Sequence, residues 1–448
     1  MAKLDRELRE YIESMTQDMG RPERRQAMSL YMTGLLLDGE RKSIEPMAAR
    51  LVEDARQIPA MRQRLQQCVV TSPWADGEMF GRLARKLERD LPDIEAFVVD
   101  DTGFPKKGTH SVGVQRQYSG TLGRTDNCQV ATSLHLASER GSGCIGLRLY
   151  LPEVWAEDQK RRRSVDIPDD VEFLRKWEIS LQQIDDALSW GVRKHVVLAD
   201  AGYGDAVEFR DGLTARELPY LVGVQGSHLV WPPGSHPHRP ARVPGVRGRP
   251  KTQFRDGDHK PLSIAALAAG LSRRAFRTVT WRQGSRGRQS SRFAFLRVHA
   301  AERHTKRRPP SDEQWLIIEW PRDEEKPTKH YLSTLPATTS HRELVRFAKL
   351  RWRIERDYQE LKQEIGLDHF EGRMWRGFHH HATLCSVAHA FLALRRALSP
   401  PEPHAVDLAH GPSPSPARAA VHRRRVPAVQ TTHRRLDAPI RSVAHVIR

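Results

Sequence analysis

The sequence is poor in cysteine and has no long apolar run. Its four cysteines, Cys68, Cys128, Cys144 and Cys385, are far apart and form no CxxC pair. This spacing argues against a zinc ribbon and fits reduced thiols in a cytoplasm. No apolar stretch approaches the roughly 20 residues of a membrane span, and the charged N-terminus lacks the apolar core of a signal peptide. We therefore expect a cytoplasmic protein that makes no membrane contact.

Acidic residues are outnumbered by basic ones throughout the chain. Lysine and arginine total 73 against 55 aspartates and glutamates, which gives a net charge of +18 over 448 residues. A basic folded protein usually binds a polyanion, and nucleic acid is the first candidate; a solubilising surface charge is the alternative. Hydrophobic residues make up 38% of the chain, enough for a core, and the length suggests two or three domains.

The spacing of apolar residues changes along the chain. Up to about residue 90, they recur every three or four positions, which predicts helices. Beyond that point, strands are predicted over 96–101, 128–138, 144–155 and 195–205, and a helix over 170–191. This order is typical of an α/β or mixed-sheet domain whose first three strands form a meander.

The C-terminal half adds an insertion, a strand and two helices. Residues from about 226 to 312 combine a Pro-, Gly- and Arg-rich loop with hairpin strands. A strand at 330–336 precedes one long helix over 340–366, with Ser340 as its N-cap, and a second helix over roughly 379–397. The rest of the chain is basic and rich in proline, which predicts a disordered tail.

Acidic residues stand at three chemically distinctive places. Asp100 and Asp101 end one apolar strand, Asp200 ends another in "VVLAD", and Glu355 lies within the long helix. A carboxylate beside a core is costly to desolvate unless a cation accompanies it, and magnesium prefers such oxygen ligands. Each acid alone has a simpler explanation, because Asp101 could cap a helix and Glu355 could pair with Arg351.

The long helix places acid and base on one face. At about 100° per residue, positions 351, 355, 358 and 362 fall together, so Arg351, Glu355, Tyr358 and Lys362 share that face. A salt-bridge ladder would explain this pattern. A metal-binding carboxylate flanked by bases that steer a DNA phosphate explains it equally.

These stretches resemble the signature motifs of bacterial insertion-sequence transposases of the DDE type. Arg351, Glu355 and Lys362 match the family's last motif, in which tyrosine, arginine, glutamate and lysine stand at fixed spacing. The tyrosine position falls on Ala348, a departure for which Tyr358 could substitute. The stretches "VVDDTGFPKKG" and "LADAGYGD" resemble the two aspartate strands, and the likeness covers roughly residues 20–398.

The resemblance implies an α/β fold with an RNase H-like catalytic core, a β-rich insertion and a preceding α-helical domain. The expected core is a mixed five-stranded sheet with acids on its first strand, its fourth strand and a late helix. The implied domains are a helical DNA-binding domain (1–92), the first part of the core (93–225), the insertion (226–328), the completion of the core (329–398) and the basic tail (399–448).

The resemblance also implies a chemistry. Asp101, Asp200 and Glu355 would be catalytic and would hold two Mg²⁺, with Mn²⁺ as an alternative ion. Asp101 is preferred to Asp100 because the family's aspartate precedes a small hydroxyl residue, here Thr102. The expected phosphate contacts are Lys106, Lys107, Arg116, Arg351 and Lys362. The enzyme would cut DNA at transposon ends and join the 3′-OH to target DNA, as a homodimer associated with the nucleoid.

Two other functions stay open. A nuclease on the same fold would cut DNA without joining strands, and a transposase-derived DNA-binding protein would do neither. The presence of all three acids argues against the binding protein. The histidine run at 379–381 is not expected to be a metal site, because adjacent helical residues point in different directions. The "GVRGRP" stretch could be a DNA-binding or a plain flexible loop.

Overall fold

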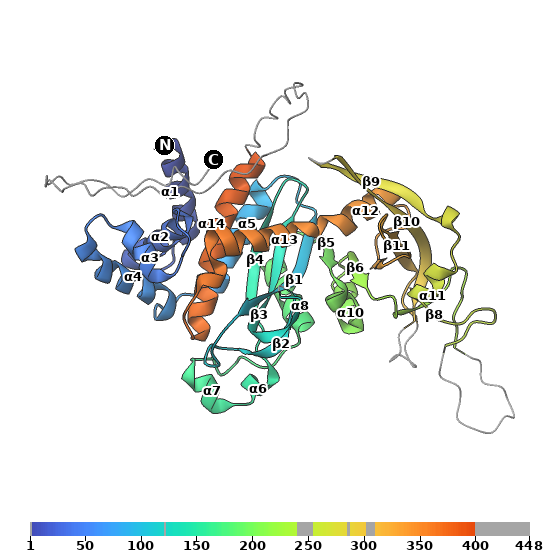
Figure 1. Cartoon of the computed structure of the whole chain (residues 1–448), viewed down its shortest axis with the longest axis horizontal. Coiled ribbons are helices and arrows are strands. Elements are labelled where there is room, and N and C mark those ends of the chain that lie inside the picture. The colour runs from blue at the N-terminus through green and yellow to red at the C-terminus, as the bar shows by residue number, and fades with distance from the viewer. Residues whose placement is uncertain (1, 121, 240–253, 285–286, 302–309, 399–448) are drawn as a thin grey trace, which may run out of the picture.

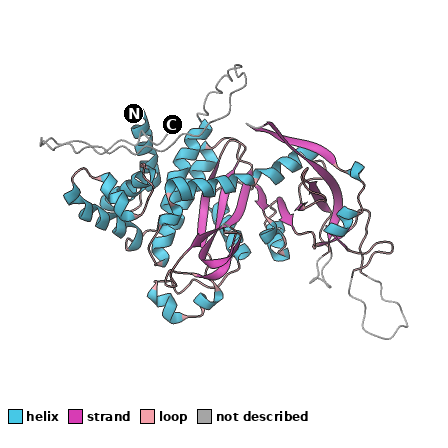
Figure 2. Ribbon diagram, in the orientation of Figure 1, coloured by secondary structure: helices cyan, strands magenta, loops and turns pink. Residues whose placement is uncertain are grey.

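The computed structural model describes residues 2–120, 122–239, 254–284, 287–301 and 310–398 (Figure 1). The predicted tail and most of the Pro-, Gly- and Arg-rich loop, including "GVRGRP", lie outside these ranges. Helices gather at one end and a curved β-rich region at the other, with a large mixed sheet between them (Figure 2). Within the described ranges, no helix is long and apolar enough to span a membrane.

The N-terminal part is helical, as its periodicity predicted. Its helices are α1 (Ala2–Thr16), α2 (Pro22–Leu36), α3 (Ile44–Leu51), α4 (Ile58–Val70) and α5 (Asp76–Asp90). Proline stands in the first turn of α2 and again of α4, where its missing N–H costs no helical hydrogen bond.

Five strands form the centre of the sheet. The strands of this half of the chain are β1 (Ala96–Pro105), β2 (Gln115–Ser119), β3 (Arg124–Ala137), β4 (Ser142–Leu149), β5 (Val196–Ala199) and β6 (Tyr220–Val224). The five central strands lie in the order β4-β3-β1-β5-β6. Strand β3 is antiparallel to β1 and β4, and β5 is parallel to β1 and β6. This arrangement contains the meander and the mixed five-stranded sheet that were expected, and β2 adds an edge to β3.

Short helices connect these strands. They are α6 (Glu153–Ala156), α7 (Gln159–Ser164), α8 (Lys176–Ser189), α9 (Ala201–Gly204) and α10 (Val207–Ala215). The strand predicted over 144–155 was too long, because β4 stops at Leu149 and Pro152 caps α6. The strand predicted over 195–205 likewise stops at Ala199, since the Asp200 side chain caps α9 instead.

The insertion continues the same sheet. It contains β7 (Leu229–Trp231), β8 (Leu262–Ser263), α11 (Ile264–Ala269), β9 (Arg277–Gly284), β10 (Gly287–Ala300) and β11 (Gln314–Trp320), and β12 (Lys329–Ser333) follows it. The β9–β10 and β10–β11 pairs confirm the predicted hairpin strands. Because β12 pairs with both β11 and β6, the insertion extends the central sheet.

The late helices differ from the prediction in one detail. The single helix expected over 340–366 is interrupted at Arg351, giving α12 (His341–Leu350), α13 (Trp352–Glu360) and a π-helical turn at Leu361–Ile365. Apolar periodicity continues through this break, so the sequence pattern could not reveal it. The predicted cap is confirmed, since Ser340 Oγ accepts a hydrogen bond from the Glu343 N–H at 3.2 Å. The last helix is α14 (Trp375–Leu398).

Two cores lie on opposite faces of β1. Phe97 and Val99 belong to a core shared with the N-terminal helices, α8 and α14. Ala96 and Val98 belong to a second core, formed with α12, α13 and the insertion. Figure 1 shows α12 and α13 crossing the sheet between these regions. The alternation along β1 therefore decides which helices each side chain meets.

The histidine run of α14 joins that helix to its surroundings. His381 is 2% exposed; its Nδ1 lies 2.8 Å from the Tyr31 hydroxyl of α2, and its Nε2 lies 3.1 Å from the Gly366 carbonyl. A neutral ring satisfies both contacts, with Nε2–H donating and Nδ1 accepting. His380 instead stacks on Trp74 at 3.7 Å between ring centroids. Neighbouring histidines thus point to separate partners, as adjacent helical residues do.

We predict a pH-dependent loss of stability through His381. Burial lowers its pKa from 6.5 to about 4, so the unfolded chain takes up this proton at higher pH than the folded one. The contribution of neutral His381 to the free energy of unfolding is fully present above pH 6.5. It decreases by about 3 kcal/mol as the pH falls to 4. Urea unfolding of wild type and His381→Gln should therefore show a difference that narrows over this range. A pH-independent difference would contradict the prediction.

Candidate active site

The two neighbouring aspartates of β1 point to opposite faces of the sheet. Asp100 continues the face of Ala96 and Val98, which α12 and α13 cover, and Asp101 continues the face of Phe97 and Val99. Asp101 accepts a hydrogen bond from Lys176 Nζ, at the start of α8, at 2.7 Å. The two carboxylates therefore have different surroundings.

Asp200 lies on the same face as Asp100. Strands β1 and β5 are parallel, and Val98 pairs with Leu198, two residues before each aspartate. Leu198 belongs to the same core as Val98, so Asp100, midway along β1, and Asp200, directly after β5, both lie beside that core. The Asp200 carboxylate caps α9 by accepting a hydrogen bond from the Gly202 N–H at 2.9 Å.

The guanidinium of Arg351 connects the acids of this face. It lies 2.8 Å from Asp100 Oδ2 and 3.1 Å from Glu355 Oε1. Burial alone would lower the pKa of Arg351, but Asp100, Asp200 and Glu355 outweigh that effect and raise it. The pairing between Arg351 and Glu355 that the sequence permitted is thus present. It is part of a larger cluster, because Arg351 also forms an ion pair with Asp100 of β1.

The charge of Asp100 is only partly balanced. Burial raises its pKa to about 7 against the opposing effect of Arg351, and Asp200 and Asp101 add to the increase. Glu355 is much more exposed, with 66% of its side chain accessible. Within the described ranges, no three His, Cys, Asp or Glu side chains are grouped so that they could hold a metal ion. Arg351 is the cation that these acids share in this structure.

Some of the bases predicted to contact DNA bond to the protein itself. Lys106 Nζ donates to the Phe370 carbonyl at 3.0 Å, and Lys362 Nζ donates to the Gly103 carbonyl at 2.8 Å. Burial lowers the pKa of Lys362 to about 8. Lys107 and Arg116 are exposed, the second on the edge strand β2. The structure therefore separates the predicted bases into a partly buried group and a surface group.

Tyr358 does not stand free at the surface, although it shares a helical face with Glu355. Its hydroxyl lies 2.7 Å from Ser133 Oγ of β3, and burial raises its pKa, with a further contribution from Asp100. Sequence reasoning missed Ser133 and Lys176 altogether. No local signal marks them, because their positions beside Asp100 and Asp101 depend on strand pairing and helix packing.

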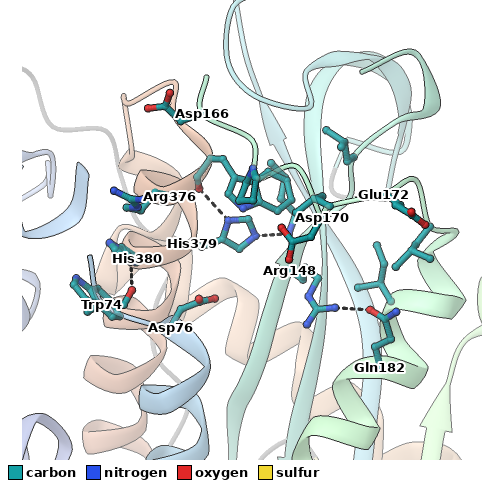
Figure 3. Close-up of a pocket in the computed structure, with 17 residues that line it drawn as sticks. Trp74, Asp76, Arg148, Asp166, Asp170, Glu172, Gln182, Arg376, His379 and His380 are labelled. Carbon is teal, nitrogen blue, oxygen red and sulfur yellow. Dashed lines mark hydrogen bonds between the residues drawn. The ribbon is translucent and has the colours of Figure 1, made fainter. Parts of the chain in front are cut away.

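A cavity lies away from the predicted catalytic acids, between α5, α8, α14 and β4 (Figure 3). Its volume is about 580 Å³, and its lining includes the acidic residues Asp76, Asp166, Asp170 and Glu172. None of the predicted catalytic acids contributes to it. Arg148 and Arg376 also line it, so the cavity is mixed in charge.

Comparison with known proteins identifies the family of the chain. A sequence model of DDE superfamily endonucleases matches residues 14–288, more than half of the chain, and the protein belongs to that family. The matched segment contains Asp100, Asp101 and Asp200 and ends before the helix of Glu355. Enzymes of this superfamily generally use divalent metal ions.

One curated relative has a more specific description than the family model. The probable transposase for insertion sequence element IS701 of Microchaete diplosiphon is 31% identical over 210 residues. The alignment covers 46% of this chain and 50% of the relative, so the chain matches about half the relative's length. The family resemblance seen in the motifs is therefore confirmed.

The Arg351 cluster leads to a prediction about charge. Replacing Arg351 with alanine should raise the pKa of Asp100 above about 7, because the cation that opposes this rise is removed. Carboxylate NMR of protein labelled at aspartate, with Asp100→Asn for assignment, measures this shift.

Arg356→Ala is the matched control. Arg356 lies on the same helix but pairs with Glu360 at 2.8 Å, so the pKa of Asp100 should stay unchanged in this variant. An unchanged or lower pKa in Arg351→Ala would show that Arg351 is not the main counter-charge of Asp100.

Proposed function

We propose that the protein is a DDE transposase with an RNase H-like core. The observation that carries this proposal is the meeting of Asp100, Asp200 and Glu355 around Arg351. Two of these acids come from adjacent parallel strands, Asp100 midway along β1 and Asp200 directly after β5, and the third comes from the helix that crosses them. The strand order β4-β3-β1-β5-β6 and the likeness to a probable insertion-sequence transposase support the same conclusion.

The geometry favours Asp100 over Asp101 as the first catalytic acid. The sequence motif had favoured Asp101 because a threonine follows it. Asp101 lies on the other face of the sheet and is paired with Lys176, whereas Asp100 shares a face with Asp200 and the Glu355 helix. Side chains on opposite faces of one strand cannot reach the same ion. The proposed metal-binding acids are therefore Asp100, Asp200 and Glu355.

The chemistry of these side chains fits divalent cations. All three are hard oxygen donors, and the raised pKa of Asp100 marks a site whose negative charge Arg351 balances only in part. Two magnesium ions are the proposed cofactors, with manganese as the substitute. When bound, they supply Lewis acids for activating water and stabilising the leaving 3′-oxygen. Arg351 pairs with both Asp100 and Glu355, and its charge opposes the rise in the pKa of Asp100.

The bases predicted to contact DNA are proposed to have two different roles. Lys107 and Arg116 are exposed and are the proposed backbone contacts. Lys106 bonds to the Phe370 carbonyl and Lys362 to the Gly103 carbonyl of β1, and their proposed role is to position these segments and add positive charge. Pairing of two transposon ends requires two active sites, so a homodimer is the proposed assembly.

The two alternatives make different products. A nuclease would cut the ends without joining them, and a binding protein would shift the DNA without cutting it. Plasmid DNA carrying the cognate element, incubated with the protein and Mg²⁺, distinguishes the three. Joined products support the transposase, nicks alone support the nuclease, and a mobility shift without cleavage supports the binding protein.

We predict unequal effects of the two neighbouring aspartates on DNA cleavage. Asp100→Asn should lower the cleavage rate by about 10³-fold or more, since several kcal/mol of charge stabilisation is lost. Asp101→Asn, the matched neighbour, should keep the rate within about tenfold, because it removes only a partly exposed ion pair. DNA affinity measured in parallel confirms that both variants fold.

The reverse result would return the catalytic role to Asp101 and contradict the assignment of sheet faces. Asp200→Asn gives a second check. If this variant cut DNA as well as wild type, the carboxylate site itself would be wrong.

A further inference from the structure

A chain of polar contacts lies beside the proposed site. Asp357 of α13 accepts a hydrogen bond from Ser142 Oγ at 2.7 Å, and its other oxygen lies 2.7 Å from His135 Nδ1. His135 Nε2 is 3.1 Å from Ser133 Oγ, which in turn lies 2.7 Å from the Tyr358 hydroxyl. The contacts thus run without interruption from β4 through β3 to two adjacent residues of α13.

Most of this chain is inaccessible to solvent. His135 and Ser133 are 0% exposed, and Asp357 is 4% exposed. Burying an imidazole and a carboxylate is costly unless both are hydrogen-bonded, and apolar residues would fill the same space at no such cost. Buried polar contacts of this kind select one alignment of two elements, because any shift leaves a group unpaired.

The alignment concerns the two elements that carry catalytic acids. Ser133 stands directly opposite Asp100 in the β1–β3 pair, and His135 stands opposite Val98. Asp357 and Tyr358 follow Glu355 by two and three residues on α13. The polar chain therefore connects the position beside Asp100 with the helical turn that holds Glu355.

We propose that His135, Ser133, Asp357 and Tyr358 are positioning residues for the carboxylate site. They hold α13 in register over β3, and so set the position of Glu355 relative to Asp100. This inference rests on the proposed function, because it assumes that these two acids bind the metal. Neither the family match nor the sequence motifs assign a role to His135, Ser133 or Asp357, and Tyr358 entered only as a substitute for the motif tyrosine.

A comparable pair elsewhere in the protein provides a matched control. His195 Nε2 lies 2.9 Å from Glu88 Oε2, and their side chains are 6% and 12% exposed. This pair joins α5 to the residue before β5, at the opposite end of that strand from Asp200. It resembles the His135–Asp357 pair in chemistry and burial but touches no proposed metal ligand.

The experiment measures Mn²⁺ binding to the full chain by calorimetry, together with the thermal midpoint. Asp357→Asn and His135→Gln should weaken Mn²⁺ binding by about 10- to 100-fold, the usual effect of losing a group that orients metal ligands. Tyr358→Phe removes one hydroxyl and should weaken binding in the same direction with little change in thermal midpoint. His195→Gln should lower the thermal midpoint and leave Mn²⁺ affinity unchanged.

The outcomes separate this inference from the function on which it rests. Mn²⁺ binding that Asp100→Asn abolishes, but that Tyr358→Phe and Asp357→Asn leave unchanged, would overturn the positioning role alone. Equal weakening by His195→Gln would also overturn it, since general loosening would then explain the effect. Failure of the wild-type chain to bind Mn²⁺ would overturn the metal site, and the inference with it.

Discussion

The central strand β1 is buried on both faces, and this constraint organises the rest of the molecule. Phe97 and Val99 pack towards the N-terminal helices and α14, while Ala96 and Val98 pack towards α12, α13 and the insertion. Asp100 and Asp101 interrupt this buried strand, which continues to the core residue Phe104. A buried carboxylate is costly unless a cation accompanies it. Asp100 pairs with Arg351, and Asp101 pairs with Lys176.

Arg351 forms ion pairs with residues from distant parts of the chain. It stands at the break between α12 and α13, and its ion pairs reach a strand about 250 residues earlier as well as the next helical turn. Lys349, two residues before it, pairs with the buried Glu319 of the insertion strand β11. The insertion, the crossing helices and β1 thus meet within a few residues of Arg351.

Much of the fold could be predicted, and the failures have physical causes. Helices before residue 90, the meander and the hairpin strands follow from apolar periodicity, which local sequence records directly. The break at Arg351 does not disturb that periodicity and was missed. Lys106 and Lys362 look like surface bases in sequence, but main-chain carbonyls of Phe370 and Gly103 accept their hydrogen bonds. Such partners are distant in the chain and carry no sequence signal.

The sequence alone determined the class of the protein, because the acids, their order and their neighbouring motifs are local features. It also identified Asp200, Glu355 and Arg351 as candidates for one site. It left the choice between Asp100 and Asp101 to a motif preference. Only the tertiary structure showed which face of β1 the Glu355 helix covers, and on that face it placed Asp100, Ser133 and the buried His135–Asp357 pair. Alternation puts neighbouring side chains on opposite faces, but packing decides what each face meets.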